Sequence, residues 1–152
     1  MYKYILFDFD GTVFDTVEGI TKSVQYALAK RGIEAELDSL RCFAGPPLVD
    51  MFMEKFDLTQ EEAEAATDDF RERYQPIGLY ECRVFPGIKE LLHALIGAGL
   101  HVGIATSKPQ HLAEKLLEGE GMLELFEVIS GSDSDGNNNS KAAVLTRAMN
   151  AL

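Results

Sequence analysis

Residues 4–12 have the sequence YILFDFDGT, and this stretch decides the fold. The residues from Tyr4 to Phe7 are apolar without alternation, which is typical of a strand covered on both faces. Two aspartates, Asp8 and Asp10, come where this predicted strand ends. Strands covered on both faces occur mainly in parallel sheets with helices on each side. The stretch therefore favours an α/β fold with polar chemistry at a strand end.

The rest of the chain predicts helices and strands in alternation after one long helical insert. Strands separated by helices imply a parallel sheet with right-handed crossovers. We expect a Rossmann-like sheet of three strands, with a core over residues 1–15 and 84–152 and an all-helical insert over 16–83. Strands are predicted over 4–7, 100–105 and 128–129, and helices over 17–30, from 38 to Gly45, 48–56, from a Thr59–Glu62 capping box to 75, 86–97, 109–118 and 140–152.

The composition excludes several classes of protein. The chain carries 14 basic and 25 acidic side chains, with a formal net charge of −11, whereas a nucleic-acid binder needs a basic face. Its 46% of apolar residues is enough to build a core, which excludes intrinsic disorder. No apolar run approaches the roughly 18 residues of a membrane helix. We expect a cytoplasmic protein with no nucleic acid or membrane partner, in which Cys42 and Cys82 are free thiols.

Polar side chains follow each of the three predicted strands. Asp8 and Asp10 follow the first, Thr106 and Ser107 follow the second, and Lys141 comes after the third. Because the carboxyl ends of parallel strands lie along one edge of a sheet, we expect these groups to converge. Two carboxylates can divide nucleophilic and acid–base work, while hydroxyls and an ammonium group bind an anion. This set favours phosphoryl transfer, in which positioning and charge neutralisation dominate catalysis.

Each of these residues also has a purely structural interpretation. A lone aspartate at a strand end is usually a turn residue, but Asp-x-Asp-Gly-Thr directly after an apolar strand is far more specific. Gly11 allows a tight turn towards a ligand. Thr106 and Ser107 could simply cap the helix that begins near Pro109, a role that is compatible with anion binding. Lys141 taken alone would be a solvated helix residue.

Several segments resemble the motifs of the haloacid dehalogenase superfamily of phosphohydrolases. Residues 8–16, DFDGTVFDT, resemble motif I; residues 105–109, ATSKP, resemble motif II; and Lys141 lies where motif III places its lysine. The insert resembles the helical cap of the phosphoglycolate phosphatase-like branch, with GPPL at residues 45–48 as the cap loop and VFPG at residues 84–87 as the return hinge. The resemblance covers essentially the whole chain and implies a cap that closes over the site.

The resemblance implies a role for each motif residue. Asp8 would attack phosphorus and form an aspartyl-phosphate, and Asp10 would protonate the leaving oxygen and then activate water. Thr106 would hydrogen-bond the phosphoryl group, and Lys141 would offset the charge on Asp8 and the phosphate. Mg²⁺ would bind the Asp8 carboxylate and the Asp10 backbone carbonyl, as suits a hard cation with oxygen ligands. Further expected contacts are to phosphate from Gly11, Thr12 and Ser107, and to substrate from the cap loop at Gly45 and Pro46.

The sequence departs from the family pattern towards its carboxyl end. Motif IV of the family, a strand whose acidic residues complete the Mg²⁺ site, does not occur before Leu152. Asp133 and Asp135 are the nearby candidates to replace it, although their surroundings are ordinary turn chemistry. In the family fold that strand pairs with the first one, so residues 4–9 would be an unpaired apolar edge. We therefore expect a shortened chain that forms homodimers and has little activity, whereas a longer form is active.

The leading hypothesis is a Mg²⁺-dependent phosphatase that acts on a small phosphorylated metabolite, or the incomplete form of such an enzyme. Phosphoglycolate, a nucleoside monophosphate and pyrophosphate are all open as substrates. A mutase is less favoured, because the cap loop offers no phosphate-binding arginine. The alternative hypothesis is a non-catalytic module that binds phosphate weakly or serves only in association.

Overall fold

The computed structural model describes residues 1–133 and 140–152, and the chain divides into two compact units. Unit 1 contains Met1–Phe14 and Val84–Leu152, and unit 2 contains Asp15–Arg83. Unit 1 is built on a parallel sheet, whereas unit 2 is formed mainly of helices. Where the chain passes between the units, β2 (Phe14–Asp15) and β3 (Arg83–Val84) pair as a two-stranded sheet.

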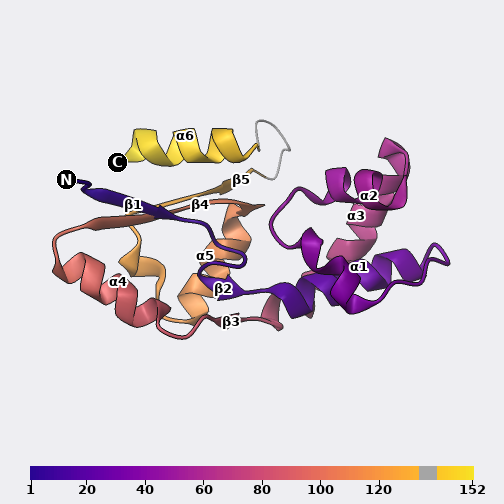
Figure 1. Cartoon of the computed structure of the whole chain (residues 1–152), viewed down its shortest axis with the longest axis horizontal. Coiled ribbons are helices and arrows are strands. Elements are labelled where there is room, and N and C mark those ends of the chain that lie inside the picture. Colours follow the sequence, from indigo (N-terminus) through magenta and orange to yellow (C-terminus); the bar gives the residue numbers. More distant parts are fainter. Residues whose placement is uncertain (134–139) are drawn as a thin grey trace. The chain divides into compact units, whose positions relative to one another are not determined.

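The sheet of unit 1 has three parallel strands in the order β1-β4-β5 (Figure 1). These strands are β1 (Tyr4–Phe7), β4 (His101–Pro109) and β5 (Val128–Ser132). The pairing of β1 with β4 runs in register as far as Phe7 and Ile104. The predicted α/β class, with a three-stranded parallel sheet and its first strand at an edge, is confirmed.

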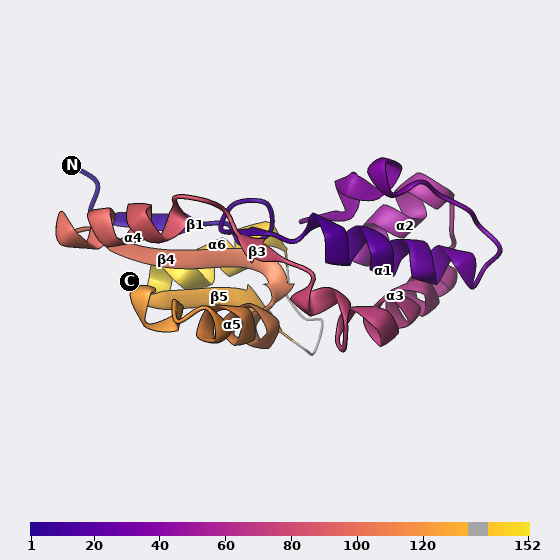
Figure 2. The same ribbon diagram turned by 90° about the horizontal axis from the view of Figure 1, so that it is seen from below.

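Helices cover both faces of this sheet (Figures 1 and 2). On one face α6 (Lys141–Ala151) packs against β4 and β5. On the other face lie α4 (Ile88–Gly97) and α5 (Gln110–Gly119), and the short 3-10 helix η3 (Leu123–Leu125) follows α5. Burial of apolar side chains between these layers forms the core of unit 1, whose fully buried members include Phe9, Val102, Ile104, Leu92, Leu117 and Val144.

Part of the apolar face of α4 and of α6 is exposed and does not pack against the sheet. Within α4, which is described in full, Leu92 is the one buried residue, and Leu91 and Ile96 are exposed. In α6 the side chains of Leu145 and Met149 are also exposed. Helical spacing predicts all four of these side chains to face the core. The described sheet has three strands, so it is too narrow to cover the whole stripe of either helix.

β4 is longer than the sequence pattern predicts. The predicted strand ends at Ala105, whereas β4 continues to Pro109, with a register shift between these two residues. The N-cap of α5 is Pro109, which makes no side-chain capping hydrogen bond. The alternative role of Thr106 and Ser107 as helix caps is therefore wrong, because both residues lie inside β4.

Unit 2 contains α1 (Val17–Ala29), α2 (Leu48–Phe56) and α3 (Gln60–Tyr74). The α-helix expected from residue 38 is instead a 3-10 helix, η1 (Leu37–Phe43), and another, η2 (Gly78–Tyr80), follows α3. The predicted capping box is confirmed. Glu62 N–H donates to Thr59 Oγ1 at 3.2 Å, and Thr59 N–H donates to Glu62 Oε2 at 2.8 Å. No helix among the described residues has the length and apolar character needed to cross a membrane.

The backbones of α1 and η2 approach each other closely at two buried glycines. A Cβ atom on Gly19 would lie 1.9 Å from the carbonyl oxygen of Gly78. A Cβ atom on Gly78 would lie 2.7 Å from Ser23 Oγ and 2.9 Å from Gly19 O. Glycine is needed at both positions because no side chain fits between these two segments.

We expect Gly19→Ala to destabilise unit 2 by about 1–3 kcal/mol, because the added methyl group would overlap a backbone oxygen that no rotamer change can move. Gly97→Ala in α4 is the matched control, since no atom lies within 4 Å of its Cβ position and alanine is the better helix former. Urea unfolding followed by circular dichroism measures both variants. Unchanged stability of Gly19→Ala would contradict the close approach.

We expect the chain to associate through the edge of β1, which has a paired strand on one side only among the described residues. A free edge presents unpaired N–H and C=O groups to another chain, and an edge lysine blocks such pairing. Tyr4 is exposed on β1, so Tyr4→Lys should lower the average mass measured by light scattering at high concentration. Ile77→Lys, which alters an exposed apolar residue of unit 2, is the control. A chain that stays monomeric at every concentration would count against this prediction.

Candidate active site

Asp8 stands at the carboxyl end of β1 with one carboxylate oxygen held by two donors. Its Oδ1 accepts a hydrogen bond from the backbone N–H of Phe9 at 2.8 Å and lies 2.8 Å from Lys141 Nζ. The side chain remains 44% exposed. An oriented carboxylate that is open to solvent is suited to attack a bound electrophile.

Lys141 connects the ends of two strands from the first turn of α6. Besides the contact with Asp8 after β1, its Nζ donates to the carbonyl oxygen of Ala105 in β4 at 2.9 Å. The start of the helix is fixed by Ser140, whose Oγ accepts a hydrogen bond from Ala143 N–H at 3.1 Å. The N-cap therefore positions the lysine, and its ammonium group lies where an anion bound beside Asp8 would need a positive charge.

The turn after β1 is closed by its own backbone hydrogen bonds. Phe9 O accepts from the N–H groups of Thr12 and Phe14, each at 3.2 Å, and Gly11 N–H donates to Phe14 O at 2.8 Å. Gly11 has a φ of 78°, a conformation that favours glycine. The N–H groups of Gly11 and Thr12 are thus engaged within the turn, and the contacts predicted from these residues to phosphate stay predictions.

Asp10 is buried against a lysine that the sequence pattern did not predict as a site residue. Its carboxylate is 8% exposed, and Lys108 Nζ, on a side chain that is 4% exposed, lies 3.2 Å from its Oδ1. Lys108 belongs to β4, and its backbone N–H donates to Thr106 Oγ1 at 3.1 Å. The sequence places Lys108 two residues after Thr106, which could have indicated a role at the site. A lysine is ordinarily exposed, however, so its burial was not predicted.

The structure thus brings the predicted residues of two strands to one edge of the sheet. Lys141 links Asp8 with β4, and Lys108 links Asp10 with the buried Thr106. Ser107 is half-buried next to them along β4. This edge combines an exposed carboxylate, a buried carboxylate, a hydroxyl and two ammonium groups, which can bind a phosphoryl group and move a proton beside it.

The oxygen donors at this edge suit Mg²⁺ in kind, although they are few. Asp8 offers an exposed carboxylate and Asp10 a backbone carbonyl, while the Asp10 carboxylate is engaged by Lys108. The described residues contain no group of three or more His, Cys, Asp and Glu side chains that could hold a metal. Asp133 lies 3.9 Å from a guanidinium nitrogen of Arg147, and Asp135 is outside the described residues. The donors present fit a Mg²⁺ ion that keeps most of its water ligands.

Unit 2 contains a cavity of about 550 Å³ whose lining carries both signs of charge. The cap-loop residues Gly45 and Pro46, which were predicted to contact substrate, are not among its lining residues in the described part of unit 2. The cavity was not predicted, because its walls come from segments far apart in the sequence. The lining residues are Asp15, Val17, Glu18, Thr21, Leu37, Asp38, Arg41, Tyr80, Glu81, Cys82 and Arg83.

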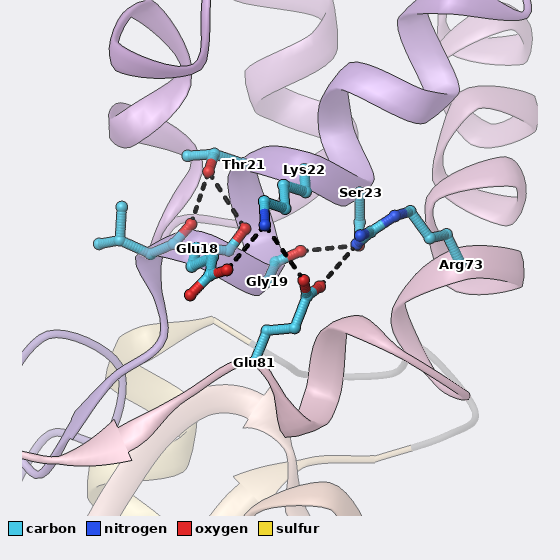
Figure 3. Close-up of polar contacts among 8 residues, drawn as sticks. Glu18, Gly19, Thr21, Lys22, Ser23, Arg73 and Glu81 are labelled. Carbon is cyan, nitrogen blue, oxygen red and sulfur yellow. Dashed lines mark hydrogen bonds and ion pairs between the residues drawn. The ribbon is translucent and has the colours of Figure 1, made fainter.

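Two of these lining residues, Glu18 and Glu81, belong to a network of charged side chains (Figure 3). Glu81 lies 2.8 Å from Arg73 and 3.4 Å from Lys22, and Lys22 also lies 2.7 Å from Glu18. Arg73 donates a further hydrogen bond to Ser23 Oγ at 3.1 Å. Hydrogen bonding from Arg73, reinforced by Lys22, holds the pKa of Glu81 below its ordinary value. The network joins α1 and α3 to the segment after η2.

We expect Glu81→Gln to destabilise unit 2 more at neutral pH than in acid. The lowered pKa of Glu81 means that its charge stabilises the folded state above the ordinary glutamate pKa of about 4.3, and that this stabilisation is lost as the pH falls through the folded value. The expected loss at pH 7 is at most about 1 kcal/mol, because the pair is partly exposed. Urea unfolding at pH 7 and at pH 3 measures it, with the exposed Glu54→Gln as control. An equal loss at both pH values would refute the electrostatic origin.

The chain belongs to the haloacid dehalogenase-like hydrolase family, whose profile matches residues 5–152. The assignment rests on this match, which covers nearly the whole chain. The family predicted from the motifs is confirmed.

Three curated relatives are similar to this chain over most of its length. A 5'-nucleotidase of Pseudomonas aeruginosa is 43% identical over 151 residues, which are 99% of this chain and 68% of that protein. Tyrosine-protein kinase PtkA of Mycobacterium tuberculosis is 36% identical over 99% of this chain and 51% of its own length. A phosphoglycolate phosphatase of Agrobacterium fabrum is 33% identical over 85% of this chain and 58% of its own length. The chain therefore spans between 51% and 68% of the length of these relatives.

A solved structure has the same fold throughout the chain. The crystal structure of a predicted phosphatase from Clostridium acetobutylicum matches with a TM-score of 0.95 and 41% identity, over 99% of this chain and 70% of that one. Each of the two units therefore has the fold found in that crystal structure.

Proposed function

We propose that the protein hydrolyses a small phosphate monoester with the help of Mg²⁺, through an aspartyl-phosphate on Asp8. The observation that carries this proposal is the 2.8 Å contact between Lys141 Nζ and the exposed Asp8 carboxylate. A lysine at this place orients the attacking oxygen and offsets the charge of an incoming phosphoryl group. Membership of a hydrolase family, and relatives named 5'-nucleotidase and phosphoglycolate phosphatase, support the same reaction.

The proposed reaction has two steps at phosphorus. An Asp8 oxygen bonds to phosphorus as the bond from phosphorus to the ester oxygen breaks. In this step Asp10 acts in its protonated form and donates that proton to the leaving oxygen. Asp10 then takes a proton from water, which attacks phosphorus, releases phosphate and restores Asp8. Thr106 donates a hydrogen bond to a phosphoryl oxygen, and Lys141 balances its charge. Mg²⁺, held by the Asp8 carboxylate and the Asp10 carbonyl, would supply further charge neutralisation.

We propose that unit 2 is the cap that recognises the leaving group, and that the substrate is a phosphorylated metabolite such as phosphoglycolate or a nucleoside monophosphate. A cavity lined by Arg41 and Arg83 together with carboxylates suits a polar molecule of this size. Cys42 and Cys82 are not joined in a disulfide, which agrees with a reducing, cytoplasmic location. The net charge of −11 favours a small-molecule substrate over nucleic acid.

A second candidate function is a phosphate-binding module without turnover. The observation in its favour is the small set of metal donors at this sheet edge, where the described residues provide one exposed carboxylate, that of Asp8, and one backbone carbonyl. Such a protein would bind phosphate at Lys141 and Thr106 but would orient Asp8 too poorly for attack.

We expect Asp8→Asn to lower the hydrolysis of p-nitrophenyl phosphate with Mg²⁺ by about 10³-fold or more, because the variant keeps the size of the side chain but removes the attacking anion. Asp50→Asn, in which an exposed aspartate of α2 is altered, is the matched control and should keep full turnover. Near-normal turnover by Asp8→Asn would refute the mechanism. If the unmodified chain binds inorganic phosphate in calorimetry without any turnover, the second candidate function is correct.

A further inference from the structure

Lys108 is a buried lysine that forms an ion pair with the buried carboxylate of Asp10. The Lys108 side chain is 4% exposed, the Asp10 side chain is 8% exposed, and the two charged atoms are 3.2 Å apart. Removing two such charges from water is unfavourable before their attraction is counted. A buried pair is therefore weak evidence for stability, and its presence at a strand end beside Asp8 calls for another explanation.

The lysine is itself held from more than one direction. Its backbone N–H donates to Thr106 Oγ1 at 3.1 Å, within the segment of β4 where the strand register shifts. Its Nζ also lies 5.7 Å from the centre of the Phe9 ring, and that ring stacks on Phe14 at 4.7 Å. A cation above an aromatic face is held by the electrons of the ring. The ammonium group is thus placed by β4 and by the turn after β1.

Each of the two lysines at the site contacts a different aspartate. Lys141 contacts the exposed Asp8, which has to meet the substrate, whereas Lys108 contacts the buried Asp10. Under the proposed function, Asp10 has to reach the leaving oxygen and later a water molecule. A displacement of about 1 Å at such a group can cost ~10²-fold in rate.

We infer that Lys108 is a positioning residue that holds the Asp10 carboxylate in the orientation needed for proton transfer. This inference rests on the proposed function, with Asp10 as the group that moves the proton. Lys108 acts through Asp10 and is not required to touch the substrate. A lysine kept only for folding could be replaced by an apolar residue of similar length without any selective effect on proton transfer.

The kinetic test compares two leaving groups in single turnovers, where release of the alcohol reports the first step alone. Glycerol phosphate needs a proton on its leaving oxygen, whereas p-nitrophenolate departs without one. Lys108→Met should slow release from glycerol phosphate by about 10- to 100-fold and release from p-nitrophenyl phosphate by far less. Lys108→Arg, which keeps the charge, should restore part of the loss. Equal slowing with both substrates, or no slowing, would overturn the inference.

Lys89→Met is the matched control, because it removes a lysine from an exposed ion pair with Glu120 at 3.0 Å in the same unit. This variant should leave both single-turnover rates unchanged. If Lys89→Met slowed glycerol phosphate as much as Lys108→Met does, the effect would come from general loss of an ion pair, and the role assigned to Lys108 would be wrong.

A second measurement needs no turnover and separates this inference from the proposed function. Three-bond couplings to the Asp10 β-protons, measured by NMR on the 152-residue chain, report whether its χ1 angle occupies one rotamer or several. We expect one rotamer in the unmodified chain and in Lys89→Met, and averaging in Lys108→Met. If no turnover is found but the couplings average, the proposed function fails and Lys108 still orients Asp10. Unchanged couplings in Lys108→Met would overturn the positioning role.

Discussion

The parallel pairing of β1 with β4 is the constraint on which the candidate site depends. Because the register runs from Tyr4 with His101 to Phe7 with Ile104, the segments that follow both strands emerge at the same edge of the sheet. The pairing is maintained by burial of the strands between helices on both faces, and this burial scales with the apolar area removed from water. A slip of one residue would turn the side chains to the opposite faces and separate the aspartates from their lysines.

The two ion pairs at this edge differ in how deeply they are buried. Asp8 and Lys141 form an exposed pair, and exposed ion pairs contribute little to stability. Either residue can therefore give up this contact for one with a substrate at little cost. The pair of Asp10 with Lys108 is buried, and breaking it leaves a charge without compensation. The first pair is therefore suited to binding and reaction, and the second to holding a fixed geometry. The same sheet edge provides both environments, because Lys141 begins a surface helix whereas Lys108 lies in the central strand.

Unit 2 depends on close backbone contact and on ion pairs between its helices and the segment after η2. Gly19 and Gly78 allow α1 and η2 to touch. Glu81 then joins the segment after η2 to Lys22 of α1 and to Arg73 of α3. The capping box at Thr59 starts α3, whose polar sequence would form a weak helix without packing against α1 and α2. The cavity of this unit is consequently a product of tertiary contacts and not of any one segment.

The sequence by itself determined the family, the first strand, the capping box and the residues Asp8 and Asp10, because the signals for these features lie within a few neighbouring positions. It left the partner of Asp10 undetermined, since Lys108 is 98 positions away and becomes a neighbour only through strand register. It also did not determine the end of β4 or the exposure of Leu91 and Met149, which depend on how much surface the sheet offers. Local chemistry is encoded in short stretches of sequence, whereas contact and burial depend on the packing of segments that are distant along the chain.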